Sequence, residues 1–448
     1  MRKIYLFICM AGLLLTACED LIEVEHPNNQ LGTPQVFEDA LTANAALGSL
    51  YAALRDVSIL RDATDLSSYA DDLDCYQQGD NGIMDIYHNL QHESNTIIRT
   101  IWERSYRHVY YANSIIYGVE NSTTLSDSDK KRIKGEATVI RSLVYFYLQQ
   151  IFGDIPYTTS LDYAFNRTIG KTETAVLMEQ LERDVTEAVG MLEDNYRHAE
   201  RIYINRKAAQ LLLARIYLTR GKWALAEQTA EDITKSPLYE FENDINEVFH
   251  KSGKHILWQL KPERSGNPVS DATYFYFSGR APHLYALTQD LVASFDDNDL
   301  RRQAWIAEVT FNNNVWFRPY KYKNRENNTN EYFIVFRLEE VYFIMAEALA
   351  KQSRFDEALP YLNATRERAG LTPLGSLSGE DFTRELLGEK RREFFTESGH
   401  RFLDLKRWGR LNELSTLKPN WEEYKQIWPL PQSEMLLNPN LNPQNTGY

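Results

Sequence analysis

The chain has 448 residues, a formal net charge of −14 and 12% aromatic residues. This length is enough to bury the core of one large domain or of two closely packed domains. The acidic balance excludes a protein that binds the nucleic-acid backbone, because such proteins need clustered lysines and arginines.

The N-terminus predicts a lipoprotein signal peptide over residues 1–17. Basic Arg2 and Lys3 precede an apolar run that is too short to span a bilayer, and small residues follow it directly before Cys18. We expect Cys18 to become an acylated N-terminus that holds the protein in the outer-membrane lipid, and residues 18–33 to be a polar tether. An ordinary secretory signal peptide is the alternative.

Residues 34–235 are predicted to form a first, helical region. Apolar residues recur with a 3.6-residue period in five stretches, which is typical of amphipathic helices packed on a core. In the last stretch, two helices fold back on each other across Gly221. The five stretches span residues 36–55, 96–119, 126–151, 177–192 and 205–233.

Residues 58–92, between the first two helices, lack a helical period. Acids and glycines interrupt short apolar pieces, and tyrosines are frequent. We expect a long loop, and loops of this length in compact helical proteins are functional or disordered. Cys75 would be the only cysteine besides acylated Cys18 in the mature chain, so no intramolecular disulfide is expected and Cys75 is interpreted as buried or incidental.

Residues 236–448 are predicted to form the second region, in one fold with the first. Short strands are expected at 255–260 and 274–277, with turn-rich segments between them. Residues 296–322 mix acids, arginines and aromatics without a helical period. We interpret this stretch as part of a binding surface.

A second helical pair is predicted over residues 337–370. Small residues such as Ala346 allow two helices to approach closely, and Phe355 fills the space between them, as in tetratricopeptide repeats. Pro360 is expected to tilt the second helix or delay its start. The pair matches 205–233 in pattern. The predicted fold class is therefore mainly α, with a tetratricopeptide-like scaffold of helical pairs and an irregular, loop-rich half that contains short strands.

Six motifs follow one another along the chain: Phe152-Gly153-Asp154-Ile155-Pro156, Asp299-Leu300-Arg301, Lys321-Tyr322, residues 337–350, Arg391-Arg392-Glu393 with residues 400–407, and residues 442–448. In this order and over this length, they resemble the SusD/RagB family. The resemblance implies four tetratricopeptide-like helical pairs that support a loop-rich half. It also implies a surface lipoprotein that binds nutrients above a SusC-like, TonB-dependent transporter of the outer membrane.

The sequence shows no motif of a known catalytic site. It has no G-x-S-x-G elbow, H-E-x-x-H pair, Cys-x-x-Cys pair, Walker loop or dinucleotide fingerprint, so no cofactor is predicted. The nine histidines lack metal-ligand spacing, so no metal site is predicted. We expect a binding protein and not an enzyme. A glycoside hydrolase is the lower-ranked alternative, because its two carboxylates cannot be recognised from spacing.

The charged residues of the motifs at 391–393 and 400–407 are interpreted as scaffold. Their signs alternate, as expected of ion pairs and of contacts at helix ends, and no nucleophile accompanies them. This interpretation applies to Arg391, Arg392, Glu393, Arg401, Asp404 and Arg407.

The composition fits a glycan-binding role. Sugars present flat C–H faces edged by hydroxyls, so tyrosine and tryptophan rings bind the faces while acids, amides and basic residues bind the rim. The candidates are therefore aromatic residues outside the periodic segments and polar residues beside them. Capture of peptides or glycopeptides by the same architecture is the alternative. The predicted ligand residues are Tyr69, Asp72, Tyr76, Asn81, Trp305, Trp316, Arg318 and Tyr320.

Overall fold

A computed structural model describes residues 33–79 and 82–448 of the chain. The predicted signal peptide, Cys18 and nearly all of the predicted tether lie outside the described residues. Within the described ranges, no helix is both long enough and apolar enough to cross a membrane.

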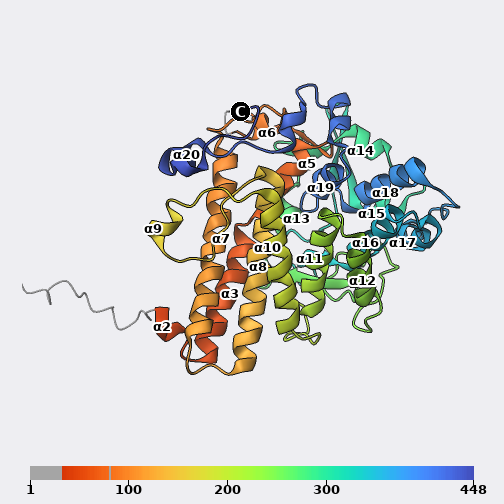
Figure 1. Ribbon diagram of the computed structural model, residues 1–448. Coiled ribbons are helices and arrows are strands. Elements are labelled where there is room, and N and C mark those ends of the chain that lie inside the picture. The colour runs from red at the N-terminus through yellow and green to blue at the C-terminus, as the bar shows by residue number, and fades with distance from the viewer. Residues whose placement is uncertain (1–32, 80–81) are drawn as a thin grey trace, which may run out of the picture.

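A row of helices forms one side of the molecule, as Figure 1 shows from α7 across to α12. The consecutive helices α7, α8, α10, α11 and α12 each pack on the next, and α3 packs on α7 and α8. Their bounds are α3 (Ala40–Asp56), α7 (Thr96–Asn121), α8 (Asp127–Phe152), α10 (Thr174–Met191), α11 (Arg206–Thr219) and α12 (Trp223–Thr234). All five predicted helical stretches are confirmed.

Local sequence signals set the ends of these helices. Asn95 caps α7 by accepting hydrogen bonds from the N–H groups of the next turn, and Ser126 caps α8 in the same way. Gly153 ends α8 with a φ of 75°, a left-handed conformation that favours glycine. These caps fix where the two longest helices begin and where α8 stops.

The second predicted pair continues the row on the far side of α12 (Figure 1). It comprises α16 (Leu338–Lys351) and α17 (Phe355–Arg368), and α18 (Gly379–Phe394) packs on both. The expected late start of the second helix is wrong, because α17 begins at Phe355 and includes Pro360. Pro360 is exposed, so water can replace the hydrogen bond that the missing N–H would have made.

Residues 58–92 are not the long loop that we expected. The described part contains α4 (Ile59–Asp62), α5 (Thr64–Tyr69), β1 (Leu73–Cys75) and α6 (Ile83–Tyr87), and every residue of α5 is buried. These elements are too short to show a period in the sequence. Tertiary packing, and not local propensity, determines their structure.

Two antiparallel sheets form the irregular half. One has four strands in the order β1-β3-β5-β4, and the other pairs β2 with β6. The turn between β4 and β5 places Asn312 and Asn313 at positive φ, as two-residue hairpins require. The additional strands are β2 (Ile256–Leu260), β3 (Tyr285–Leu287), β4 (Ile306–Phe311), β5 (Asn314–Pro319) and β6 (Phe333–Arg337).

The strand predicted at 255–260 is confirmed, whereas the strand predicted at 274–277 is wrong. The chain there forms the short helix α13 and then an irregular segment. The remaining elements are α2 (Thr33–Val36), α9 (Tyr163–Asn166), α13 (Ser270–Tyr274), α14 (Gln289–Ala293), α15 (Leu300–Trp305), α19 (His400–Arg407), α20 (Gln432–Leu437), and the 3-10 turns η2 (Leu411–Thr416), η3 (Glu423–Gln426) and η4 (Pro439–Leu441). The fold is mainly helical with short strands, as predicted.

Buried ion pairs join α18 to the rest of the fold. The fully buried Glu393 accepts from Arg337 at 2.5 Å and from Arg368 at 2.6 Å. Burial opposes the ionisation of Glu393, but these arginines outweigh it and hold the pKa of its carboxyl below its usual range. The scaffold interpretation of the charged motifs is therefore confirmed. Further pairs are Arg392–Glu389, Arg401–Asp71, Lys390–Asp404 and Arg407–Glu347.

Candidate functional site

The candidate site is the face of the four-stranded sheet that bears Trp316. Side chains alternate along β5, so Phe317 points into a buried core while Trp316 and Arg318 emerge together on the opposite face. Trp316 packs there on Phe277 and on Val309, which lies opposite it on β4. This packing fixes the position of the indole ring while leaving it only partly buried.

Tyr76 lies beside Trp316 at the end of β1. Its backbone N–H donates to the carbonyl of Leu284 at 2.7 Å, which extends the pairing of β1 beyond Cys75. The Tyr76 side chain is 37% exposed. Burial and the charge of Asp74 raise the pKa of its phenol, and the neighbouring Trp316 side chain acts in the opposite direction. Two of the predicted ligand residues, 240 positions apart in the sequence, thus lie side by side.

Arg318 lies between two tyrosine rings on the same face. Its guanidinium carbon is 4.9 Å from the ring centroid of Tyr276 and 4.8 Å from that of Tyr320. Its Nε is buried without a hydrogen-bond partner, and Arg318 forms no ion pair with any described carboxylate. Burial lowers the pKa of this guanidinium. The arrangement offers unused N–H donors between aromatic rings.

We call Tyr76, Tyr276, Trp316, Arg318 and Tyr320 the aromatic platform. Four of these five residues were predicted from the sequence, whereas Tyr276 was not, because residues 274–277 were interpreted as a strand. The run Tyr-Phe-Tyr-Phe at 274–277 was the available signal. The platform combines ring faces with a cation and hydroxyls, which is the chemistry that binds a sugar.

Two family models match the chain. Residues 22–218 match the model described as "Starch-binding associating with outer membrane", and residues 301–425 match the model of the SusD family. The chain belongs to the SusD family. Proteins of the SusD family are non-catalytic binding proteins, and the family description associates them with the outer membrane.

Similar proteins agree with this assignment over nearly the whole chain. The SusD-like protein P2 of Formosa agariphila is 25% identical, and the alignment covers all of both chains. A crystal structure of a SusD superfamily protein from Bacteroides vulgatus has a TM-score of 0.78 at 21% identity, covering 92% of this chain and 99% of that one. Surface glycan-binding protein A from Bacteroides thetaiotaomicron, solved with laminarihexaose, has a TM-score of 0.76 at 19% identity, covering 90% and 98%. These structures share the SusD fold.

Three predicted ligand residues lie in the core of this SusD-family protein instead of at its surface. Tyr69 is fully buried among Phe402, Trp421 and Trp428, and its hydroxyl donates to the carbonyl of Lys425 at 2.6 Å. It is therefore a core residue, and we remove it from the candidate site.

Asp72 and Trp305 are removed for the same reason. Asp72 is fully buried and accepts from Arg391 at 3.1 Å, while Trp305 is 1% exposed and donates through its indole N–H to the carbonyl of Ile245 at 3.0 Å. Aromatic residues in non-periodic segments serve cores as well as surfaces, so sequence alone did not separate these cases. Asn81 lies outside the described residues.

The described part of the structure contains no cluster of metal-ligating side chains. No group of three or more His, Cys, Asp or Glu side chains there could hold a metal ion. Cys75 is buried and free, and burial raises the pKa of its thiol, so this cysteine lacks the lowered pKa of a reactive thiolate.

Proposed function

We propose that this protein is a cell-surface receptor that binds an oligosaccharide on the aromatic platform and delivers it to a SusC-like, TonB-dependent transporter. The unpaired guanidinium of Arg318, held between Tyr276 and Tyr320 and two residues from Trp316, is the observation that carries the proposal. Sugar rings stack on aromatic faces, and their hydroxyls accept hydrogen bonds from the guanidinium.

The similar proteins indicate which glycan to test first. Surface glycan-binding protein A was solved with laminarihexaose, and it has the same fold as this chain. We therefore infer that a short neutral glucan is a suitable first ligand.

The ligand class is tested by calorimetric titration of the purified protein with laminarihexaose, maltohexaose and a mixed hexapeptide. We expect saturable binding of at least one glycan, a loss of about tenfold or more in affinity for Trp316→Ala, and no cleavage of the glycan. Because truncation of a tryptophan anchor in a binding site typically costs about 2 kcal/mol or more, the expected loss is measurable. Binding of the peptide alone would replace the glycan assignment by peptide uptake. Release of shorter sugars would indicate a hydrolase.

A lipid anchor at Cys18 is part of the proposal. The predicted lipobox supports it, since acylation of a cysteine behind a signal peptide retains a protein at the membrane. Cys18→Ala should move the protein from the outer-membrane fraction to the soluble fraction. Retention of the variant in the membrane fraction would contradict the anchor.

An exposed apolar groove supports a protein partner. It lies between α7, the α9 segment and α20, and its cavity volume is about 580 Å³. Tyr163 is 76% exposed and Leu437 is 69% exposed, and Tyr110 on α7 is also exposed. Exposed apolar patches of this kind mark interaction surfaces. We propose that the transporter covers this groove.

The docking surface is tested by affinity purification from outer membranes after chemical cross-linking. The wild-type protein should capture a protein with the sequence of a TonB-dependent transporter, and the double variant Tyr163→Ser with Leu437→Ser should lose most of it. Leu41→Ser is the matched control, because Leu41 is 81% exposed on α3 and does not line the groove. Equal capture by the double variant and the control would contradict this surface.

A further inference from the structure

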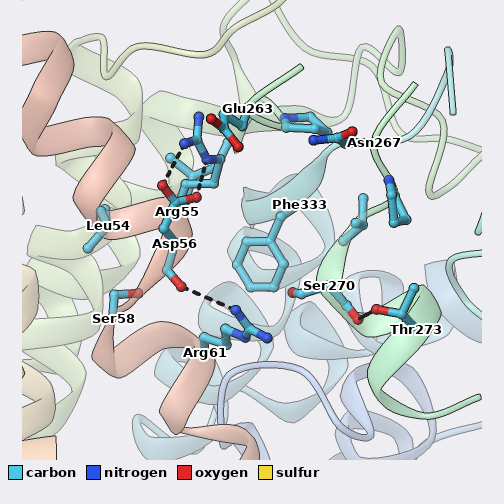
Figure 2. A pocket seen from close by; sticks show the side chains of 14 residues that line it. Leu54, Arg55, Asp56, Ser58, Arg61, Glu263, Asn267, Ser270, Thr273 and Phe333 are labelled. Atoms are coloured by element: carbon cyan, nitrogen blue, oxygen red, sulfur yellow. Dashed lines mark hydrogen bonds and ion pairs between the residues drawn. The ribbon is translucent and has the colours of Figure 1, made fainter. Parts of the chain in front are cut away.

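A second cavity, of about 390 Å³, lies between the C-terminal end of α3, α4 and the loop that precedes α13 (Figure 2). Its volume falls within the range of about 300–1,000 Å³ that small-ligand sites have. None of the platform residues lines it. The ring of Phe333 lies in the middle of this cavity in Figure 2 and provides a flat apolar surface.

Ser58 contributes an unsatisfied hydroxyl to this cavity. It occupies the position before α4, where a serine side chain ordinarily accepts from the helix N–H groups, yet it makes no such bond. Ser58 is fully buried, and its Oγ has no hydrogen-bond partner. Figure 2 shows the hydroxyl pointing toward the Phe333 ring. A buried hydroxyl without a partner costs free energy, and a ligand atom in the cavity would remove that cost.

Arg61 contributes an unpaired cation. Its Nη1 donates to the backbone carbonyl of Asp56 at 3.1 Å, and among the described residues no carboxylate forms an ion pair with it. In Figure 2 the guanidinium lies beneath the Phe333 ring and faces Ser270. Its other N–H groups are therefore available to a ligand.

No carboxylate that lines the cavity forms an ion pair with Arg61, although the Arg61 charge also acts on the carboxyls of Asp62 and Asp271, which lie outside the lining. The Asp56 carboxylate is held by Arg55, with two contacts of 2.5 and 2.6 Å. Glu263 lies at the rim, where its side chain is 60% exposed. The Ser270 hydroxyl donates to Asp271 at 3.2 Å and can still accept a hydrogen bond.

We propose that this cavity binds a carboxylate-bearing sugar, such as a uronic acid residue of an acidic glycan. The Arg61 guanidinium matches the two oxygens of a carboxylate, because planar arginine and carboxylate groups form paired hydrogen bonds. The Ser58 hydroxyl donates a further bond, and the sugar face packs on Phe333. This cavity is separate from the aromatic platform, and its proposed ligand is charged.

The experiment compares two matched ligands on the full mature chain. One is a glucuronate tetrasaccharide, and the other is the same tetrasaccharide after reduction of its carboxylates to neutral glucose units. Titration calorimetry should show that the acidic ligand binds about 10- to 100-fold more tightly, because a charge-assisted hydrogen bond is lost on reduction. The preference should shrink as salt is added. Equal binding of the two ligands, or binding of neither, would overturn the proposal.

Two arginine variants test whether the cavity itself, and not the general charge of this region, binds the glucuronate ligand. Arg61→Gln should weaken binding of the glucuronate ligand by about tenfold or more. Arg264→Gln is the matched control, because Arg264 is an exposed arginine of the same loop that does not line the cavity, and it should change affinity less than twofold. Unchanged affinity in Arg61→Gln would overturn the proposal.

Two further measurements identify the site and the ligand class. Trp316→Ala should keep the preference for the acidic ligand. If this variant loses the preference, the ligand carboxylate binds at the aromatic platform and not in this cavity. Tetraglutamate should bind at least tenfold more weakly than the glucuronate tetrasaccharide. If tetraglutamate binds as tightly, and with the same dependence on Arg61, the sugar assignment is overturned in favour of an acidic peptide.

Discussion

The guanidinium carbon of Arg318 lies 4.8 Å from the centre of the Tyr320 ring, and its Nε is buried without a partner. We expect Arg318→Gln to weaken glycan binding by about tenfold, because a ligand hydroxyl loses a charge-assisted hydrogen bond. Arg302→Gln is a matched control, since Arg302 stacks on Phe317 at 4.7 Å and Phe317 points to the other face of the sheet. Titration calorimetry measures both variants, and equal losses would contradict a specific role for Arg318.

The two tryptophans Trp305 and Trp316 should respond oppositely to substitution by alanine. Trp305 is 1% exposed in the core, so its removal leaves a cavity and should lower the free energy of unfolding by about 3–5 kcal/mol. Trp316 is partly exposed, and its removal should cost about 1 kcal/mol of stability but abolish most glycan binding. Urea unfolding and calorimetry on the same preparations separate the two effects. A strongly destabilised Trp316→Ala protein would argue that Trp316 is a core residue.

The pair formed by Asp72 and Arg391 should be essential for stability. Both side chains are buried, and the two groups are 3.1 Å apart. Asp72→Ala leaves the Arg391 charge without one of its partners, so we expect the free energy of unfolding to fall by about 3 kcal/mol. Asp381→Ala is the control, because Asp381 pairs with Arg384 at an exposed site and should contribute less than about 1 kcal/mol. Similar urea midpoints for the two variants would contradict this prediction.

Asp65 should make stability fall as the pH rises. Burial raises the pKa of its carboxyl from 3.8 to about 7, although the Tyr285 hydroxyl donates to it at 2.9 Å. The folded state therefore holds a proton that the unfolded state releases, and this contribution is complete below pH 3.8 and is lost as the pH reaches about 7. The free energy of unfolding of the wild type should fall by about 2–4 kcal/mol over that window, and Asp65→Asn should abolish this fall.

Urea unfolding at pH 4, 5, 6, 7 and 8 measures the effect of Asp65→Asn. The exposed Asp297→Asn is the control, and its stability should follow the wild-type pH dependence. If Asp65→Asn also follows the wild type across these pH values, the Asp65 carboxyl is already ionised in the folded protein near neutral pH.

The helical scaffold could be predicted because its signal is local. Apolar spacing and caps such as Ser126 lie within a few residues of the helices that they define. The short elements of residues 58–92 could not be predicted, since they depend on distant partners. Asp72, for example, contacts Arg391 across 319 positions of sequence.

The candidate site was predicted only in part, because aromatic residues outside periodic segments divide between core and surface. Trp305 and Trp316 lie in similar sequence surroundings. They differ in the structure, because Trp305 ends α15 with its side chain buried, whereas Trp316 lies on β5 at a position where the side chain is only partly buried. Tyr276 escaped prediction because the period of residues 274–277 is that of a strand. The Arg318 guanidinium is available to a ligand because its Nε has no hydrogen-bond partner, and no sequence pattern shows whether an arginine has a partner.

Two ion pairs, Arg391–Asp72 and Arg401–Asp71, hold the residues directly before β1. Tyr76, directly after β1, is exposed to solvent. Under the proposed function, the residues that attach this short segment to the fold therefore differ from the residue that contacts the ligand. The exposed residue can therefore be substituted to suit another ligand without breaking the ion pairs that attach the segment.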